Sequence, residues 1–157
     1  MWVGIVALNP PVGALLMCVL SLFRPESTMN IPAVALMIGG LLPLLPKIPM
    51  AVAIRRTGKG YNNASPRDQQ ATLQGMGKRA LAAHNNSFEA FPFFAVGVLL
   101  ALHQGLEGST LDNLCLVWVA ARVAYVFFYV KGLSRWRSAM WGVGLFSATG
   151  IYITALG

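Results

Sequence analysis

Four long apolar segments, separated by short polar connections, constrain this chain more than any other feature of its sequence. The segments cover approximately residues 31–54, 88–106, 111–130 and 138–156. A helix needs about 20 mainly apolar residues to cross a bilayer, and each segment reaches or nearly reaches that length. With 56% hydrophobic and 11% charged residues, the sequence predicts an all-α integral membrane protein with a four-helix transmembrane bundle.

A further apolar segment precedes these four. It covers residues 1–28 and is interrupted by Asn9-Pro10-Pro11. It does not begin with the basic n-region that is typical of a cleavable signal peptide, so we do not interpret it as one. We interpret it as an extra N-terminal hydrophobic helix. The predicted organisation is therefore an N-terminal segment, residues 1–28, followed by a four-helix membrane domain, residues 29–157.

The basic residues cluster in two of the connections. One connection contains Arg55, Arg56, Lys59, Arg67, Lys78 and Arg79, and the other contains Lys131, Arg135 and Arg137. The connection between the second and third segments contains Glu107 and Asp112 and no Lys or Arg. Because Lys and Arg collect in cytoplasmic loops, both basic connections are predicted to be cytoplasmic. The clustering does not form a continuous basic face, so nucleic acid is not expected as a partner.

The two cysteines do not indicate a metal site. Cys18 and Cys115 lie inside apolar segments, without a CxxC motif or a nearby pair of histidines. We therefore expect neither a disulfide nor a bound metal.

A polar stripe precedes the second segment. Ser65-Pro66-Arg67-Asp68 is typical of a helix start, and we expect one helix to run from Pro66 to about residue 102. On that helix Arg79 and Asn86 lie within about 20° of each other, and Glu89 lies about 60° further round. A carboxylate near the membrane needs a partner. Glu89 either pairs with a neighbouring helix or lines a polar ligand cavity with Asn86.

A second polar stripe lies on the third segment, where Arg122, Tyr125 and Tyr129 share one helical face. An arginine inside the membrane must meet an anion or a dipole, and Glu89 is the expected protein partner. The tyrosines suit either a site or an interfacial belt. Beyond them, Arg135 is interpreted as a cytoplasmic anchor, whereas Arg137 and Ser138 suit an anchor or a catalytic or binding role.

These residues together resemble a known family. The elements are Arg79-Ala80, Asn86-x-x-Glu89-x-Phe91-Pro92, Arg122-x-x-Tyr125-x-x-x-Tyr129 and Arg137-Ser138. They resemble the MAPEG family, membrane-associated proteins in eicosanoid and glutathione metabolism, over about residues 31–156, and look most like its bacterial members. The resemblance implies a homotrimer in a bacterial inner membrane, with glutathione as cosubstrate between adjacent subunits near the cytoplasmic face.

The implied activity is that of a glutathione-dependent transferase or peroxidase acting on apolar electrophiles or lipid hydroperoxides delivered by the membrane. Arg137 would stabilise the thiolate as the catalytic residue, with Arg135 as the alternative because the spacing after Tyr129 varies within the family. The implied binding residues are Arg55, Arg56, Arg79, Asn86, Glu89, Arg122, Tyr125, Tyr129 and Ser138. Either Arg55 or Arg56 would hold a carboxylate of the tripeptide.

The chain departs from the family pattern at two positions. Well-characterised glutathione-using members carry arginine four residues before the motif asparagine, and some carry another immediately before it; here these positions are Ala82 and Asn85. This departure keeps a second interpretation open. The protein would then be non-catalytic, and its polar stripes would serve oligomer assembly or bind a lipid or partner.

Overall fold

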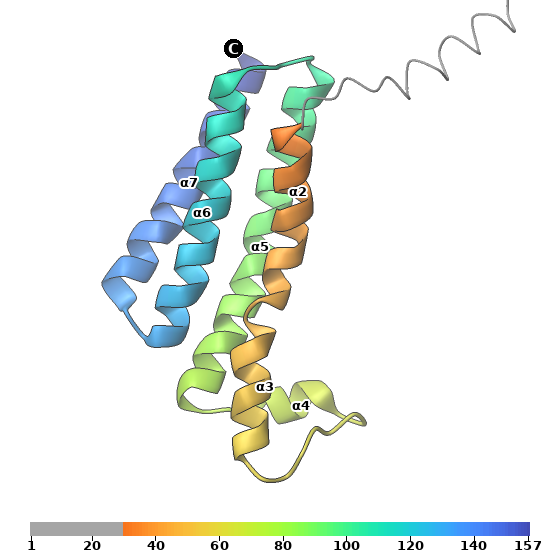
Figure 1. Ribbon diagram of the computed structural model, residues 1–157, viewed down its shortest axis with the longest axis vertical. Coiled ribbons are helices and arrows are strands. Elements are labelled where there is room, and N and C mark those ends of the chain that lie inside the picture. The colour runs from red at the N-terminus through yellow and green to blue at the C-terminus, as the bar shows by residue number, and fades with distance from the viewer. Residues whose placement is uncertain (1–29) are drawn as a thin grey trace, which may run out of the picture.

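The computed structural model describes residues 30–157, and the predicted N-terminal helix of residues 1–28, with Cys18, lies outside this range. Four stretches of the described chain are long and apolar enough to cross a membrane: Ile31–Arg56, Gly75–His103, Ser109–Lys131 and Ser134–Leu156. The last three are the helices α5, α6 and α7. All four run side by side (Figure 1), so the predicted fold, an all-α four-helix transmembrane bundle, is confirmed.

The first span is divided at its two central prolines. It consists of α2 (Ile31–Leu41), the short 3₁₀ helix η1 (Leu42–Leu44) and α3 (Lys47–Arg56). Pro43 and Pro46 have no backbone N–H, so the helical hydrogen bonds cannot continue through them. The ring of His84, on α5, donates its Nδ1–H to the Pro43 carbonyl oxygen over 2.6 Å, because a carbonyl oxygen can only accept. Residues 31–54, which the sequence marks as one segment, thus form a broken helix.

The expected continuous helix from Pro66 to residue 102 is wrong. A short helix, α4, does begin at Pro66, but it ends at Ala71, and α5 starts afresh at Gly75. Gly75 has a φ of +55°, a backbone conformation that interrupts a right-handed helix. The residue between the helices that matters most is Leu73, which is only 4% exposed. Burying this apolar side chain against the start of α5 requires the chain to turn.

Close packing of α5, α6 and α7 forms the core. The rings of Phe94 on α5 and Trp118 on α6 stack with centroids 3.7 Å apart, and Ile151 on α7 is fully buried in the same cluster. Small residues let the helices approach, as at Gly150, where an added Cβ would lie 3.2 Å from the Leu114 side chain. In a bilayer, such packing rather than the hydrophobic effect holds helices together.

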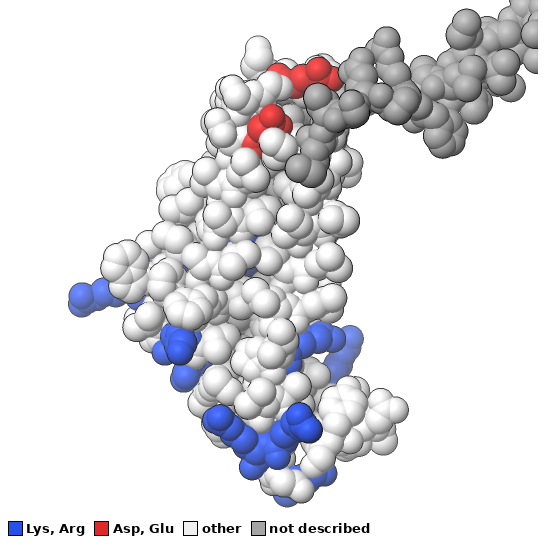
Figure 2. All heavy atoms as spheres, viewed as in Figure 1, with Lys and Arg blue, Asp and Glu red and all other residues white. Residues whose placement is uncertain are grey.

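Charge separates along the long axis of the bundle. Figure 2 shows Lys and Arg over the lower part of the molecule, and Asp and Glu at the end where α5 connects to α6. At the basic end, α3 and α4 extend beyond the turn between α6 and α7 (Figure 1). The two basic connections therefore lie at the same end, as the predicted topology requires, and their assignment to the cytoplasm stays a prediction.

Candidate functional site

A polar network joins α5 and α6 inside the bundle. Arg122 is only 2% exposed, and its Nη2 donates to Asn86 Oδ1 over 3.0 Å and to the Asn86 backbone oxygen over 3.3 Å. The Asn86 Nδ2 in turn donates to Glu89 Oε2 over 3.1 Å. An amide can accept from a cation and donate to a carboxylate at once. Asn86 therefore links the two charged side chains.

This arrangement corrects the expected pairing of Arg122 with Glu89. The guanidinium meets the Asn86 side chain and backbone instead, and Glu89 is reached only through the amide. The reason is geometric: Asn86 and Glu89 differ by about 60° around α5, and α6 packs closer to Asn86. Glu89 itself is exposed on the surface of the single chain.

Two tyrosine rings connect Arg122 of this network to Arg137, nearer the basic end. The Arg122 guanidinium carbon lies 4.2 Å from the centroid of the Tyr125 ring. Tyr125 packs edge-on against Tyr129, with centroids 5.4 Å apart, and Arg137 of α7 lies 4.7 Å from the Tyr129 centroid. Cation–π contacts of this kind hold a guanidinium in place without neutralising its positive charge. Arg122, Tyr125 and Tyr129, which were predicted to share a face of α6, are thus connected to Arg137 by a continuous series of contacts.

Three adjoining pockets follow this ladder of side chains. The first, about 230 Å³, is lined by Asn86, Glu89, Ala90, Phe93, Trp118, Arg122, Trp141, Gly144, Leu145 and Ala148. The middle pocket, about 280 Å³, is lined by Asn86, Tyr125, Tyr129, Arg137, Ser138 and Trp141. The third, about 380 Å³, is lined by Lys78, Arg79, Ala82, Phe128, Tyr129, Gly132, Leu133, Ser134 and Arg137. We call them the apolar, middle and rim pockets.

Shared residues connect the pockets into one groove. Asn86 and Trp141 line both the apolar and the middle pocket, and Tyr129 and Arg137 line both the middle and the rim pocket. The groove runs between α5 and the pair α6–α7, from the basic end into the depth of the bundle. It can hold a charged group at one end and an apolar group at the other.

The structure brings most of the predicted site residues to this groove. Asn86, Glu89, Arg122, Tyr125, Tyr129, Arg137 and Ser138 line the apolar or middle pocket, and Arg79 lines the rim pocket. Arg135 is exposed and lines none of the three pockets, so the geometry separates it from Arg137.

The two arginines at the end of α3 lie elsewhere. Arg55 is exposed, and Arg56 lines a separate pocket with Thr57, Thr72 and Gln74. Neither lines the groove of its own chain.

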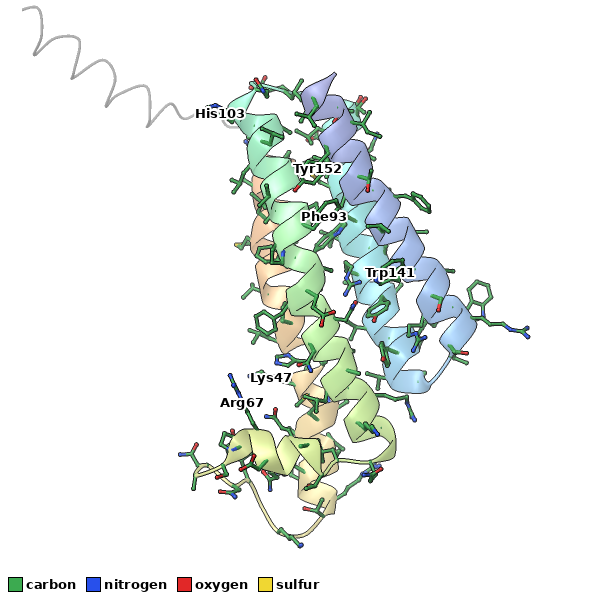
Figure 3. All side chains as sticks on the ribbon, turned by 180° about the vertical axis from the view of Figure 1, so that it is seen from behind. Lys47, Arg67, Phe93, His103, Trp141 and Tyr152 are labelled. Carbon is green, nitrogen blue, oxygen red and sulfur yellow. The ribbon has the colours of Figure 1, made fainter. Side chains whose placement is uncertain are left out.

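Sequence reasoning missed the apolar wall of the groove. The sequence analysis did not single out Phe93 or Trp141, yet both line the apolar pocket, and Phe93 stacks on Tyr152 with centroids 4.8 Å apart. Figure 3 shows Phe93 and Tyr152 where α5 meets α7, with Trp141 nearer the basic end of α7. Helical spacing was the available signal, since Phe93 lies two turns after Asn86 and Trp141 one turn after Arg137.

Comparison with models of protein families gives a match over most of the chain. The model of the family described as "MAPEG family" matches residues 31–157, which include all four spans and every residue of the groove. Searches of curated proteins and of solved structures return no match.

Proposed function

Since the chain belongs to the MAPEG family of membrane proteins in glutathione and eicosanoid metabolism, we propose that it is a glutathione-dependent transferase or peroxidase. Its acceptors are apolar electrophiles or lipid hydroperoxides. The observation that carries the proposal is the groove, which joins a cationic end at Arg137 to an apolar end at Phe93 and Trp141. A hydrophilic thiol and a membrane-soluble acceptor can meet in it.

Arg137 is the residue that activates the thiol. A thiol with an ordinary pKa of about 8.5 is mostly protonated at neutral pH, and only the thiolate is a strong nucleophile. A guanidinium about 4 Å away contributes an attraction of about 4 kcal/mol at an effective dielectric constant of 20, enough to populate the thiolate. Contact with the Tyr129 ring orients Arg137 while leaving its N–H donors available, and the hydroxyl of Ser138 lines the same pocket.

In a transferase, the thiolate sulfur supplies the electron pair of a new carbon–sulfur bond, while a leaving group departs with its bonding pair or the π electrons of the electrophile shift and take up a proton. In a peroxidase, the thiolate attacks one oxygen of the hydroperoxide, the oxygen–oxygen bond breaks, and the other oxygen takes up a proton and leaves as the alcohol. A second glutathione then reduces the resulting sulfenic acid, which gives the disulfide and water. The residues of the groove divide the remaining work. Glu89 and Asn86 bind the polar groups of the tripeptide, Tyr125 and Tyr129 contribute further contacts, and the apolar pocket receives the acceptor. Arg122 holds the Asn86 amide in the orientation that presents Glu89.

We propose a homotrimer with the basic end in the cytoplasm, in a bacterial inner membrane. Arg55 and Arg56 lie outside the groove of their own chain, and a neighbouring protomer is the source that would bring one of them to a glutathione carboxylate. Glu89 is exposed in the single chain, and an exposed carboxylate within a span is costly in lipid. Covering it with a bound ammonium group or a second protomer removes that cost.

The test is the ultraviolet difference absorbance of the thiolate when glutathione is added to detergent-solubilised protein, followed as a function of pH. In the wild type the signal should rise at a pH below the ordinary thiol pKa of about 8.5, because Arg137 favours the charged form. In Arg137→Ala the midpoint should move back towards about 8.5. Arg135→Ala, which removes a neighbouring cation outside the groove, should keep the wild-type midpoint.

Two results contradict this assignment. If Arg135→Ala moves the midpoint and Arg137→Ala does not, the thiolate lies against Arg135. If glutathione binds to the wild type without a thiolate signal at any pH below the ordinary thiol pKa, the enzyme activity is rejected.

A non-catalytic role is the second candidate, and one observation favours it. Asn86 already accepts from the buried Arg122 and donates to Glu89 within the chain, so Arg122 has a partner without a ligand. A protein of this kind would use Glu89 for assembly or for binding a lipid or partner. Glu89→Ala would then dissociate the oligomer in detergent, whereas an enzyme would keep its oligomer and lose affinity for the thiol.

A further inference from the structure

The rim pocket contains one cation, Lys78, to which no role has been assigned so far. Its lining includes three cations, Lys78, Arg79 and Arg137, and no Asp or Glu. They come from two helices, α5 and α7, and the rest of the lining is apolar or hydroxyl-bearing. A concave site lined by cations without a carboxylate among them favours an anion.

Arg79 is already engaged by the protein. Its Nε donates to the Val130 backbone oxygen over 3.1 Å, close to the end of α6 at Lys131. Its guanidinium also packs over Gly132, where an added Cβ would lie 3.4 Å from Arg79 Nε. The unpaired carbonyl groups at a helix C-terminus attract a cation. Arg79 therefore ties α5 to α6, and part of its charge is compensated there.

Lys78 is the cation left for a ligand. It is exposed, and within residues 30–157 no acceptor binds its ammonium group. It lies one helical turn before Ala82 and lines the rim pocket together with it. Residues four apart on a helix share a face. Lys78 therefore places a positive charge on the face of α5 where Ala82 and Asn85 are uncharged.

We propose that Lys78 binds a carboxylate of the thiol cosubstrate in the rim pocket, which rests on the proposed function and extends it. The ammonium group meets the carboxylate at the basic end, Arg137 stands at the junction with the middle pocket, and the thiol lies beyond it. Lys78, one turn before Ala82 and two turns before Asn85, thus makes the cationic contact that these two residues cannot make.

The rise along α5 between Lys78 and Asn86 is close to the length of a tripeptide. Lys78 precedes Asn86 by eight residues, which is about 12 Å along a helix. An extended tripeptide spans about 10 to 11 Å. One carboxylate at Lys78 therefore leaves the other end of the ligand at Asn86 and Glu89, where a carboxylate and an amide suit its ammonium group.

The lining also favours a peptide over a phospholipid headgroup. Beyond Arg137 the groove continues through Tyr129, Ser138 and Asn86, which offer hydrogen bonds to peptide groups. The acyl chains of a lipid bound by its headgroup at Lys78 would have to leave this path. An anionic lipid is accordingly the competing occupant that the experiment must distinguish.

The experiment compares the affinities of glutathione and its glycine monoethyl ester, by equilibrium dialysis with solubilised protein. The variants are Lys78→Ala, the conservative Lys78→Arg, and Lys131→Ala, which removes an exposed cation of the same end that lines no pocket of the groove. Loss of one charge-assisted contact should weaken glutathione binding about tenfold in Lys78→Ala. The ester should bind wild type and Lys78→Ala about equally, and Lys78→Arg and Lys131→Ala should resemble wild type.

Each other outcome overturns the assignment in a recognisable way. If wild type binds glutathione and Lys78→Ala binds it equally well, the anchor is refuted while the proposed function stands. If Lys78→Ala weakens both thiols to the same extent, Lys78 supports the fold rather than a carboxylate. If anionic phospholipid displaces glutathione from wild type but not from Lys78→Ala, the pocket belongs to a lipid headgroup. If wild type binds neither thiol, the proposed function and the anchor fail together.

Discussion

Replacing Asn86 by leucine tests whether the amide holds the buried arginine in place. Leucine has a similar size but neither accepts from Arg122 nor donates to Glu89. Arg122, at 2% exposure, would keep only the Asn86 backbone oxygen at 3.3 Å and the face of the Tyr125 ring. The perturbation therefore removes one hydrogen bond to a buried charge and leaves the packing volume almost unchanged.

The expected cost follows from these contacts. A hydrogen bond to a charged group contributes about 1.5 to 3 kcal/mol in soluble proteins. Between membrane helices the measured values are smaller, about 0.6 kcal/mol on average and about 1.7 at most, because the unfolded chain in the membrane also finds partners. The lost bond to the exposed Glu89 adds almost nothing. We expect Asn86→Leu to lower the free energy of unfolding by about 1 to 2 kcal/mol.

The assay is reversible unfolding in mixed micelles with increasing dodecyl sulfate, followed by tryptophan fluorescence and circular dichroism. Asn85→Leu is the matched control, because Asn85 is the adjacent residue of the same type and its side chain is exposed. It should change the free energy by no more than about 0.5 kcal/mol. If Asn86→Leu is as stable as Asn85→Leu, Arg122 has another partner and the network described here does not stabilise the fold.

Two further predictions concern helix contacts. Gly77→Ala should destabilise the bundle by about 1 to 3 kcal/mol, because the added Cβ would lie 2.8 Å from the Ala53 Cβ. The control is Gly142→Ala, where nothing lies within 4 Å of the added Cβ, and it should be neutral in the same unfolding assay. Equal effects of the two substitutions would refute the contact. Tyr152→Phe should cost about 0.5 to 1.5 kcal/mol, since it removes the hydroxyl that donates to the Phe93 oxygen over 2.9 Å but keeps the stacked ring. An unchanged free energy of unfolding would show that this hydrogen bond does not contribute.

The spans and the shared faces were predictable because both depend on a single helix. Length and apolar composition identify a membrane span without knowledge of its neighbours, and the angle between Arg122, Tyr125 and Tyr129 follows from helical periodicity alone. The clustering of basic residues in two connections likewise predicted which loops lie at the same end. These properties are determined by the sequence itself.

The partners of those residues were decided by the tertiary structure. A helical wheel gives angles about one axis, but not how far each helix is rotated against the next. Stacking of Phe94 on Trp118 sets that rotation for α5 against α6, where Asn86 rather than Glu89 contacts Arg122. Burial of Leu73 starts α5 anew at Gly75, and packing at the start of α5 brings Lys78 to the rim pocket, because contacts distant in sequence outweigh local helical preference.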